Sequence, residues 1–186
     1  MLDVGCGHGL LALHLAAGSA RREVVGVDID EAKITAARRA AAAAPSLPNV
    51  AFASADDLAT IDGPFAAVTV VDVLYLLTAE HQEALVRSLA CRLAPGGSLL
   101  VKEMAPTPRW KHRWMHGEEV LATRVARITA STDGVLHHTA PEDVRRWMTT
   151  EGLAVSDRRL DRRRPYPHHL VVGVAPAAGG SPTPTG

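Results

Sequence analysis

The sequence predicts an α/β fold in which helices cover both faces of a doubly wound, mostly parallel sheet. β-branched apolar runs alternate with helix-like runs from residue 1 to about residue 104, and this alternation is typical of parallel strands joined by helices. The chain has 186 residues, which is enough for one sizeable hydrophobic core and not for two. Glycines and acidic residues follow the predicted strands, where ligands bind in such sheets.

The first predicted element is a short strand that ends in a glycine loop. The chain begins MLDVGCGHG, so Asp3 precedes Gly5, Gly7 and Gly9. A helix is predicted over residues 10–17. Glycines at a strand-to-helix turn let backbone N–H groups approach a ligand closely, because no Cβ intervenes. The spacing differs from the dinucleotide-binding pattern G-x-G-x-x-G, since the third glycine comes one residue early.

The second predicted strand covers the β-branched run 23–28, which is typical of a buried parallel strand. It ends in Asp28, about 20 residues after the glycines, where a βαβ nucleotide-binding unit carries a ribose-binding acid. A carboxylate there can accept hydrogen bonds from both ribose hydroxyls. The alternative is that Asp28 is an ordinary turn residue. Asp30 is predicted to cap a helix over residues 31–44.

The third predicted strand covers residues 49–54 and leads into an acidic loop. Asp56 and Asp57 have two interpretations of equal weight. Either Asp56 contacts a ligand, or it forms with Asp57 an acidic pair at a helix N-terminus.

The fourth apolar run covers residues 67–77 and contains Asp72. A helix-like segment follows and ends in Pro95 and Gly96. These two residues fit a turn with Pro at its second position and Gly at its third. A fifth strand is predicted directly after this turn.

These motifs resemble those of the class I S-adenosylmethionine (SAM) methyltransferases. The shared features are D-x-G-x-G-x-G, the acid that ends the second strand, and the L-x-P-G-G step into the fifth strand. The resemblance covers residues 1–104 well and residues 141–174 loosely. It implies a Rossmann-like, seven-stranded sheet whose last strand is antiparallel. Helices commonly precede the first strand in this family, and none stands before it here, so either the protein is minimal or this start lies inside a longer reading frame. Residues 105–140 match no family pattern.

The resemblance implies a SAM-binding site at the carboxyl ends of the strands. The loop after the third strand departs from the usual G-D-A-x-x-L, because Ala53 and Ser54 stand where Gly and Asp are usual. Asp72 falls where the family contacts the methionine part of the cofactor. The cofactor-binding residues that follow from the resemblance are Asp3, Gly5, Cys6, Gly7, Gly9, Asp28, Ile29, Ser54, Ala55, Asp56 and Asp72.

The C-terminal part completes one domain over residues 1–175. Thr139 to Asp143 is a helix start with Pro141 in the first turn, and Gly152 is expected to end this helix. Strands are predicted over residues 153–160 and 169–174. Residues 176–186 contain only Pro, Ala, Gly, Ser and Thr and are predicted to be a disordered tail.

Residues 105–140 are predicted to be an inserted segment that borders the acceptor pocket and contains an added helix. Trp110 and Trp114 bring aromatic lining to it. One alternative is that these tryptophans pack against the sheet. The other is that the segment makes a homodimer contact and a partner subunit supplies the pocket wall.

A general base is needed only when the acceptor atom starts protonated. Histidine titrates near neutrality, and a tyrosine after the fourth strand could face the acceptor. The candidates are His112, His116, His138 and Tyr75, although each is individually better explained as structural or solvent-exposed. The i,i+4 histidine pair lacks an adjacent glutamate and a third ligand, so no metal site is predicted.

The function predicted is SAM-dependent methyl transfer to a small-molecule acceptor, with oxygen favoured. Lys and Arg number 20, as do Asp and Glu, so no basic field indicates nucleic acid. Residues 72–75 read DVLY and lack the Asn/Asp-Pro-Pro-aromatic motif of amino-methylating nucleic-acid enzymes. No apolar run is long enough to span a membrane, and two cysteines without a C-x-x-C favour a cytoplasmic protein.

Two other functions remain open at this point. One is a SAM-binding or scaffold module without catalytic activity, because no helices precede the first strand to cover the cofactor. The other is a NAD-dependent oxidoreductase, which the glycine spacing disfavours.

Overall fold

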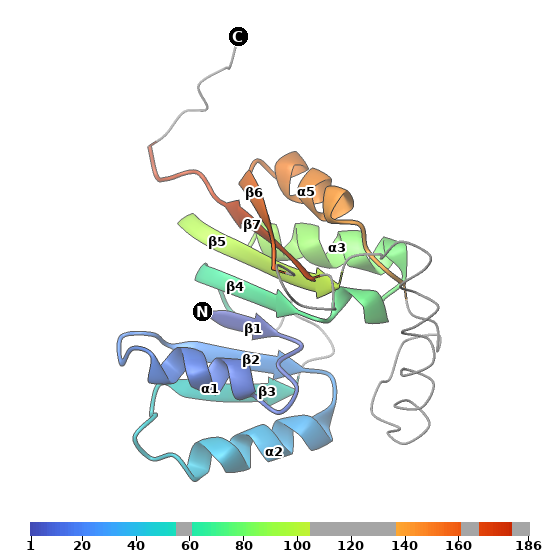
Figure 1. Ribbon diagram of the computed structural model, residues 1–186. Helices are drawn as coiled ribbons and strands as arrows, with labels where there is room; N and C mark the ends of the chain where they lie inside the picture. Colours follow the sequence, from blue (N-terminus) through green and yellow to red (C-terminus); the bar gives the residue numbers. More distant parts are fainter. Residues whose placement is uncertain (55–60, 105–136, 161–167, 180–186) are drawn as a thin grey trace.

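The computed structural model describes residues 1–54, 61–104, 137–160 and 168–179 (Figure 1). Within these residues, seven strands form one sheet in the order β3-β2-β1-β4-β5-β7-β6. The strand pairs from β3 to β5 are parallel, whereas β7 runs antiparallel to both β5 and β6. The predicted doubly wound, mostly parallel sheet with an antiparallel last strand is therefore confirmed.

The first half of the chain forms one edge of the sheet, and two helices pack on it (Figure 1). Ala12, Ala16, Ile34 and Ala37 of the helices are buried against Val24 and Phe52. Small alanines let the helices approach the strands closely. The elements are β1 (Leu2–Val4), α1 (Leu10–Ala17), β2 (Val24–Asp28), α2 (Glu31–Ala42) and β3 (Val50–Ser54).

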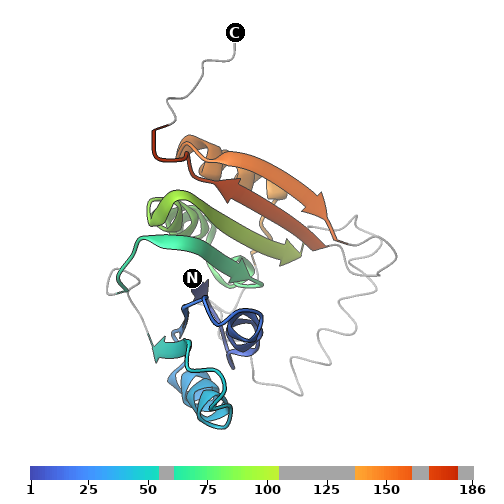
Figure 2. The ribbon, with the colours of Figure 1, turned by 90° about the vertical axis from the view of Figure 1, so that its left-hand side faces the viewer.

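The second half carries the larger hydrophobic core, and Figure 2 shows its strands from another side. Val86 and Leu89 of α3 pack with Val27 and with residues of α5 and the central strands. Val24 and Val27 of β2 belong to different cores because alternate strand residues point to opposite faces. The elements are β4 (Phe65–Val71), the 3-10 helix η2 (Leu74–Leu76), α3 (Ala79–Ala90), β5 (Leu93–Met104), α5 (Pro141–Thr150), β6 (Ala154–Arg159) and β7 (His168–Val174).

Local signals in the sequence place several helix ends correctly, although α2 ends at Ala42 and not at the predicted residue 44. The Asp30 carboxylate accepts hydrogen bonds from the N–H groups of Ala32 and Lys33, at 3.0 and 3.2 Å, and so caps α2. Helix α5 begins at Pro141, and Gly152 follows it with a φ of 78°. Strand β5 begins earlier than predicted, because Leu93 pairs with Phe65 ahead of the Pro-Gly turn.

Several predictions fall on residues outside the described part of the chain. These are the interpretations of Ala55 and Asp56, the inserted segment with its tryptophans and with His112 and His116, and the last residues of the tail. Pro176, the first residue of the predicted tail, is among the described residues, and its carbonyl accepts a hydrogen bond of 3.0 Å from the Gly96 N–H. No helix among the described residues is long and apolar enough to cross a membrane.

Candidate functional site

Four strand ends meet at one edge of the sheet. Asp28 is in register with Ser54, so β2 and β3 end together. Strand β1 ends at Val4, directly before Gly5, and β4 ends at Val71, directly before Asp72. The described residues predicted to bind the cofactor therefore share this carboxyl edge, where open α/β sheets bind ligands.

Gly5 and Gly7 of the loop both have a positive φ but different surroundings. Gly5 has a φ of 68°, and a Cβ added there would lie 2.3 Å from Val73 Cγ2. Gly7 has a φ of 54°, yet a Cβ added there would meet nothing within 4 Å. Gly5 is thus required by packing, whereas Gly7 lies beside open space. Open space beside a glycine at a strand-to-helix turn lets a ligand approach the backbone closely, because no Cβ intervenes.

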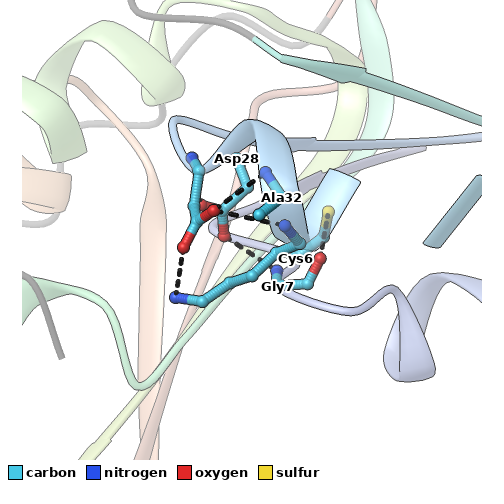
Figure 3. Close-up of polar contacts among 6 residues, drawn as sticks. Cys6, Gly7, Asp28 and Ala32 are labelled. Atoms are coloured by element: carbon cyan, nitrogen blue, oxygen red, sulfur yellow. Dashed lines mark hydrogen bonds and ion pairs between the residues drawn. The ribbon is translucent and has the colours of Figure 1, made fainter. Parts of the chain in front are cut away.

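Asp28 ties the glycine loop to β2 (Figure 3). Its Oδ2 accepts the Gly7 N–H at 2.8 Å, and its Oδ1 accepts the Asp30 N–H at 2.9 Å. The Cys6 N–H also donates to the Val27 carbonyl at 3.0 Å. A carboxylate has about four lone-pair positions, so Asp28 can accept further hydrogen bonds while it holds the loop.

Asp3 is buried beneath the loop with one oxygen unsatisfied. The Thr69 hydroxyl donates to its Oδ1 at 2.7 Å, whereas its Oδ2 has no hydrogen-bond partner among the described residues. Burial raises the pKa of Asp3, and the hydrogen bond from Thr69 only partly opposes this. A buried acceptor without a donor is costly, so the position favours a ligand or water that can donate a hydrogen bond.

Cys6 is a poor nucleophile in this setting. Burial, followed by the negative charges of Asp3 and Asp28, raises the pKa of its thiol to about 12. The thiolate is the reactive form of cysteine, so Cys6 is neutral at physiological pH and acts here by packing and backbone contacts.

Asp72 begins the turn that follows β4. Its φ is 56°, a left-handed conformation that Asp tolerates better than most residues. Its N–H donates to the Lys102 carbonyl at 2.9 Å, and its carboxylate pairs with the Lys102 ammonium.

Sequence reasoning missed Glu103, which lies next to Lys102 on β5. Its side chain is only 6% exposed, and its Oε1 accepts the N–H groups of Val73 and Leu74 at 3.0 and 2.8 Å. Burial raises the pKa of Glu103 to about 7, although these two hydrogen bonds oppose the shift. The available signal was an acid near the end of a strand, directly after the apolar run 99–101 and Lys102.

Two of the four catalytic candidates lie in the described residues. Tyr75 is half-buried in η2, and its carbonyl accepts the His137 N–H at 2.9 Å. His138 is exposed just before α5.

In the described parts of the chain, no three His, Cys, Asp or Glu side chains gather as metal ligands would. Near the glycine loop and Asp28, Leu10 and Ile29 are 78% and 68% exposed.

Residues 1–97 match the family described as a methyltransferase domain. The chain belongs to this family. The match covers the glycine loop, Asp28 and the turn after β4, which are the elements that build the carboxyl-edge site. The resemblance to class I SAM methyltransferases inferred from the motifs is therefore confirmed.

Two curated relatives are methyltransferases of small molecules by name. The ubiquinone biosynthesis O-methyltransferase of Xanthomonas axonopodis pv. citri is 29% identical over 165 residues, which cover 84% of this chain and 63% of that protein. The demethylmenaquinone methyltransferase of Thermus thermophilus is 40% identical over 111 residues, which cover 59% of this chain and 49% of that protein. This chain thus spans less than two thirds of either relative.

The fold is also that of a solved methyltransferase. The crystal structure of magnesium protoporphyrin IX methyltransferase from Synechocystis PCC 6803, with bound S-adenosylhomocysteine (SAH), superposes with a TM-score of 0.71. It is 23% identical, and the alignment covers 94% of this chain and 73% of that one. The architecture is therefore shared.

Proposed function

We propose that this chain binds SAM at the carboxyl edge of the sheet and directs its methyl group to a small-molecule acceptor. The observation that carries the proposal is the Gly7–Asp28 pair. Asp28 fixes a loop whose Gly7 borders open space, and it keeps further lone pairs for a ligand. Family membership supports SAM over NAD as the ligand, as does the glycine spacing.

The described residues fit the parts of SAM. Asp28 would accept hydrogen bonds from the ribose hydroxyls, and the exposed Ile29 would pack on the adenine beside Ser54. The methionine part would lie in the open space beside Gly7. Asp3 offers an unsatisfied buried oxygen to a donor such as the cofactor's ammonium group, directly or through water.

The reaction demands little covalent chemistry of the protein. Bound SAM would supply a methyl group on a sulfonium, which an acceptor atom displaces in line. The residues of the edge would hold the donor and acceptor in that geometry and limit access of water. Tyr75 and His138 are the described candidates to take a proton from the acceptor, and His112 and His116 are the others.

The acceptor is proposed to be a small molecule methylated on oxygen. The name of the Xanthomonas relative supports oxygen, and both relatives' names support a small molecule. The balanced charge of the chain gives no support to a nucleic-acid acceptor. We also propose that the segment 105–140 borders the acceptor. In that case Trp114→Ala should lower acceptor turnover while SAH affinity stays within a few-fold. If the segment instead makes a homodimer contact, the Trp114→Ala variant should be monomeric.

Isothermal titration calorimetry with SAH tests the cofactor assignment. Asp28→Ala removes charge-assisted hydrogen bonds worth roughly 1.5–3 kcal/mol, so its affinity should fall about ten- to a hundredfold. Asp157→Ala is the matched control, because Asp157 lies on β6 and pairs only with the surface Arg145 in the described structure. Millimolar binding by the wild type, or normal binding by Asp28→Ala, contradicts the proposal.

The two alternative functions predict other outcomes. Tighter binding of NAD than of SAH would favour a NAD-dependent oxidoreductase. SAH binding without turnover of any acceptor would favour a SAM-binding scaffold without catalytic activity.

A further inference from the structure

The turn after β4, residues 72–77, is held by two consecutive residues of β5. Lys102 binds Asp72 through its carbonyl and its ammonium group. Glu103 binds the next two N–H groups, those of Val73 and Leu74. Neighbouring strand residues point to opposite faces of the sheet, so the turn is fixed from both faces at once.

The carbonyl groups of the same turn are also satisfied by a buried side chain. The Gln82 amide of α3 donates to the carbonyls of Leu74 and Leu77, each at 3.0 Å. Gln82 is 2% exposed. Glu103 and Gln82 thus satisfy the donors and the acceptors of one short turn, which leaves it little freedom to move.

The turn in its fixed position touches the glycine loop. A Cβ added to Gly5 would lie 2.3 Å from Val73 Cγ2 and 3.3 Å from Val73 Cγ1. The Val73 side chain therefore fills the space beside Gly5, and no room remains for either to move towards the other. Contacts run without a break from Glu103 through Val73 to the start of the glycine loop.

Holding a carboxylate at this depth is costly to the fold. Among the described residues, the charged groups that act on Glu103 are Asp72, which raises its pKa further, and Lys102, which lowers it. His169 is its register partner on β7, and Thr139 lines the same small cavity. Burial has the largest effect, and it disfavours the charged form. A costly buried acid beside a ligand edge points to a functional requirement.

We propose that Glu103 is a positioning residue of the cofactor site, which sets cofactor affinity by fixing the turn after β4 against Gly5. It acts through Val73 and does not touch the cofactor itself. The inference rests on the proposed SAM-binding function. The competing view is that Glu103 only stabilises the fold by satisfying the first N–H groups of η2.

SAH calorimetry on two Glu103 variants distinguishes these views. In Glu103→Gln a single amide oxygen can accept both N–H groups, because both bonds in the wild type go to Oε1. Glu103→Leu replaces the carboxylate by a slightly shorter apolar side chain and removes the acceptor. SAH affinity should fall about tenfold or more in the Leu variant, which loses two hydrogen bonds, and should stay within about threefold in the Gln variant.

Val171→Ala is the matched control for lost stability. Val171 is 2% exposed on β7 and lines the same cavity as Glu103, yet no hydrogen bond joins its side chain to the turn. It should lower the midpoint of thermal unfolding and leave SAH affinity unchanged. All titrations are made at a temperature where each variant is fully folded by circular dichroism.

Val73→Ala provides a second route, which matters if Glu103→Leu does not fold. It leaves Glu103 and its hydrogen bonds in place but removes the contact with Gly5, so SAH affinity should again fall several-fold. Unchanged SAH affinity in Val73→Ala, or in a folded Glu103→Leu, overturns this inference alone. Failure of the wild type to bind SAH overturns the proposed function and this inference with it.

Discussion

Asp28 and Glu103 are two acids next to the glycine loop, and each accepts hydrogen bonds from two backbone N–H groups. Asp28 is half-buried and binds Gly7 and Asp30 through separate oxygens. Glu103 is buried and binds its two donors through one oxygen. The partly exposed acid can hold the loop and still reach a ligand, whereas the buried acid can act only through the turn. We therefore propose that similar chemistry serves binding in one place and positioning in the other.

Gly5 and Gly7 offer the largest test of this division, because Gly5 contacts the turn held by Glu103 and Gly7 contacts Asp28. Gly5→Ala combines an unfavourable φ with a clash against Val73, so the free energy of unfolding should fall by about 3 kcal/mol or more. Gly7→Ala carries the φ penalty alone and should cost about 1–2 kcal/mol. Urea unfolding measures both.

SAH binding of Gly7→Ala tests the second half of this division. Gly7→Ala should lose SAH affinity out of proportion to its small loss of stability, because its new methyl group would point into open space where the ligand is proposed to lie. If Gly7→Ala binds SAH like the wild type, the ligand does not approach Gly7, and Asp28 is reduced to a structural residue.

The pH dependence of stability gives the next largest effect. Burial raises the pKa of Glu103 from 4.5 to about 7 in the folded protein, so the folded state holds this proton more tightly than the unfolded state. The resulting stabilisation is fully present below pH 4.5 and is lost as the pH rises through 7. Glu103→Gln does not titrate. Its free energy of unfolding, relative to the wild type, should therefore rise between pH 5 and pH 8 by on the order of 2–3 kcal/mol.

Urea unfolding of the two proteins at both pH values measures that difference. Asp3, whose pKa is also raised by burial, is present in both proteins and cancels in the comparison. A difference that stays flat between pH 5 and pH 8 would show that Glu103 is not desolvated as its burial implies.

The two acids also differ in whether the sequence alone could predict their place in the site. Asp28 could be predicted because it stands at a known spacing from a glycine motif and at the end of an apolar run. The Asp30 cap could be predicted for a similar reason, since a local pattern determines it, whereas the antiparallel last strand followed from the family resemblance. Glu103 follows no spacing rule. Its role depends on where the turn after β4 lies in space, and that turn is 30 residues away from Glu103 at Val73.

Amide substitution should have unequal effects at the two acids. Glu103→Gln keeps an acceptor for both donors, but Asp28→Asn cannot, because each carboxylate oxygen accepts a different N–H. One donor would face the new NH₂ group, and SAH affinity should fall about tenfold through the disturbed loop and the lost ribose contact. Calorimetry on both amide variants gives the comparison. Equal tolerance at the two sites would contradict the hydrogen-bond geometry described here.

The smallest expected effect concerns Lys102, the partner of Glu103 in holding the turn. Lys102→Met removes the ion pair with Asp72 and keeps the carbonyl that accepts the Asp72 N–H. The Asp72 and Lys102 side chains are 39% and 20% exposed, so the pair should contribute no more than about 1 kcal/mol, screened by salt. We expect SAH affinity within about threefold of the wild type, and an unfolding free energy that approaches the wild-type value at high salt. A tenfold loss of SAH affinity in Lys102→Met would show that the charged side chain, and not the buried hydrogen bonds of Glu103, positions the turn.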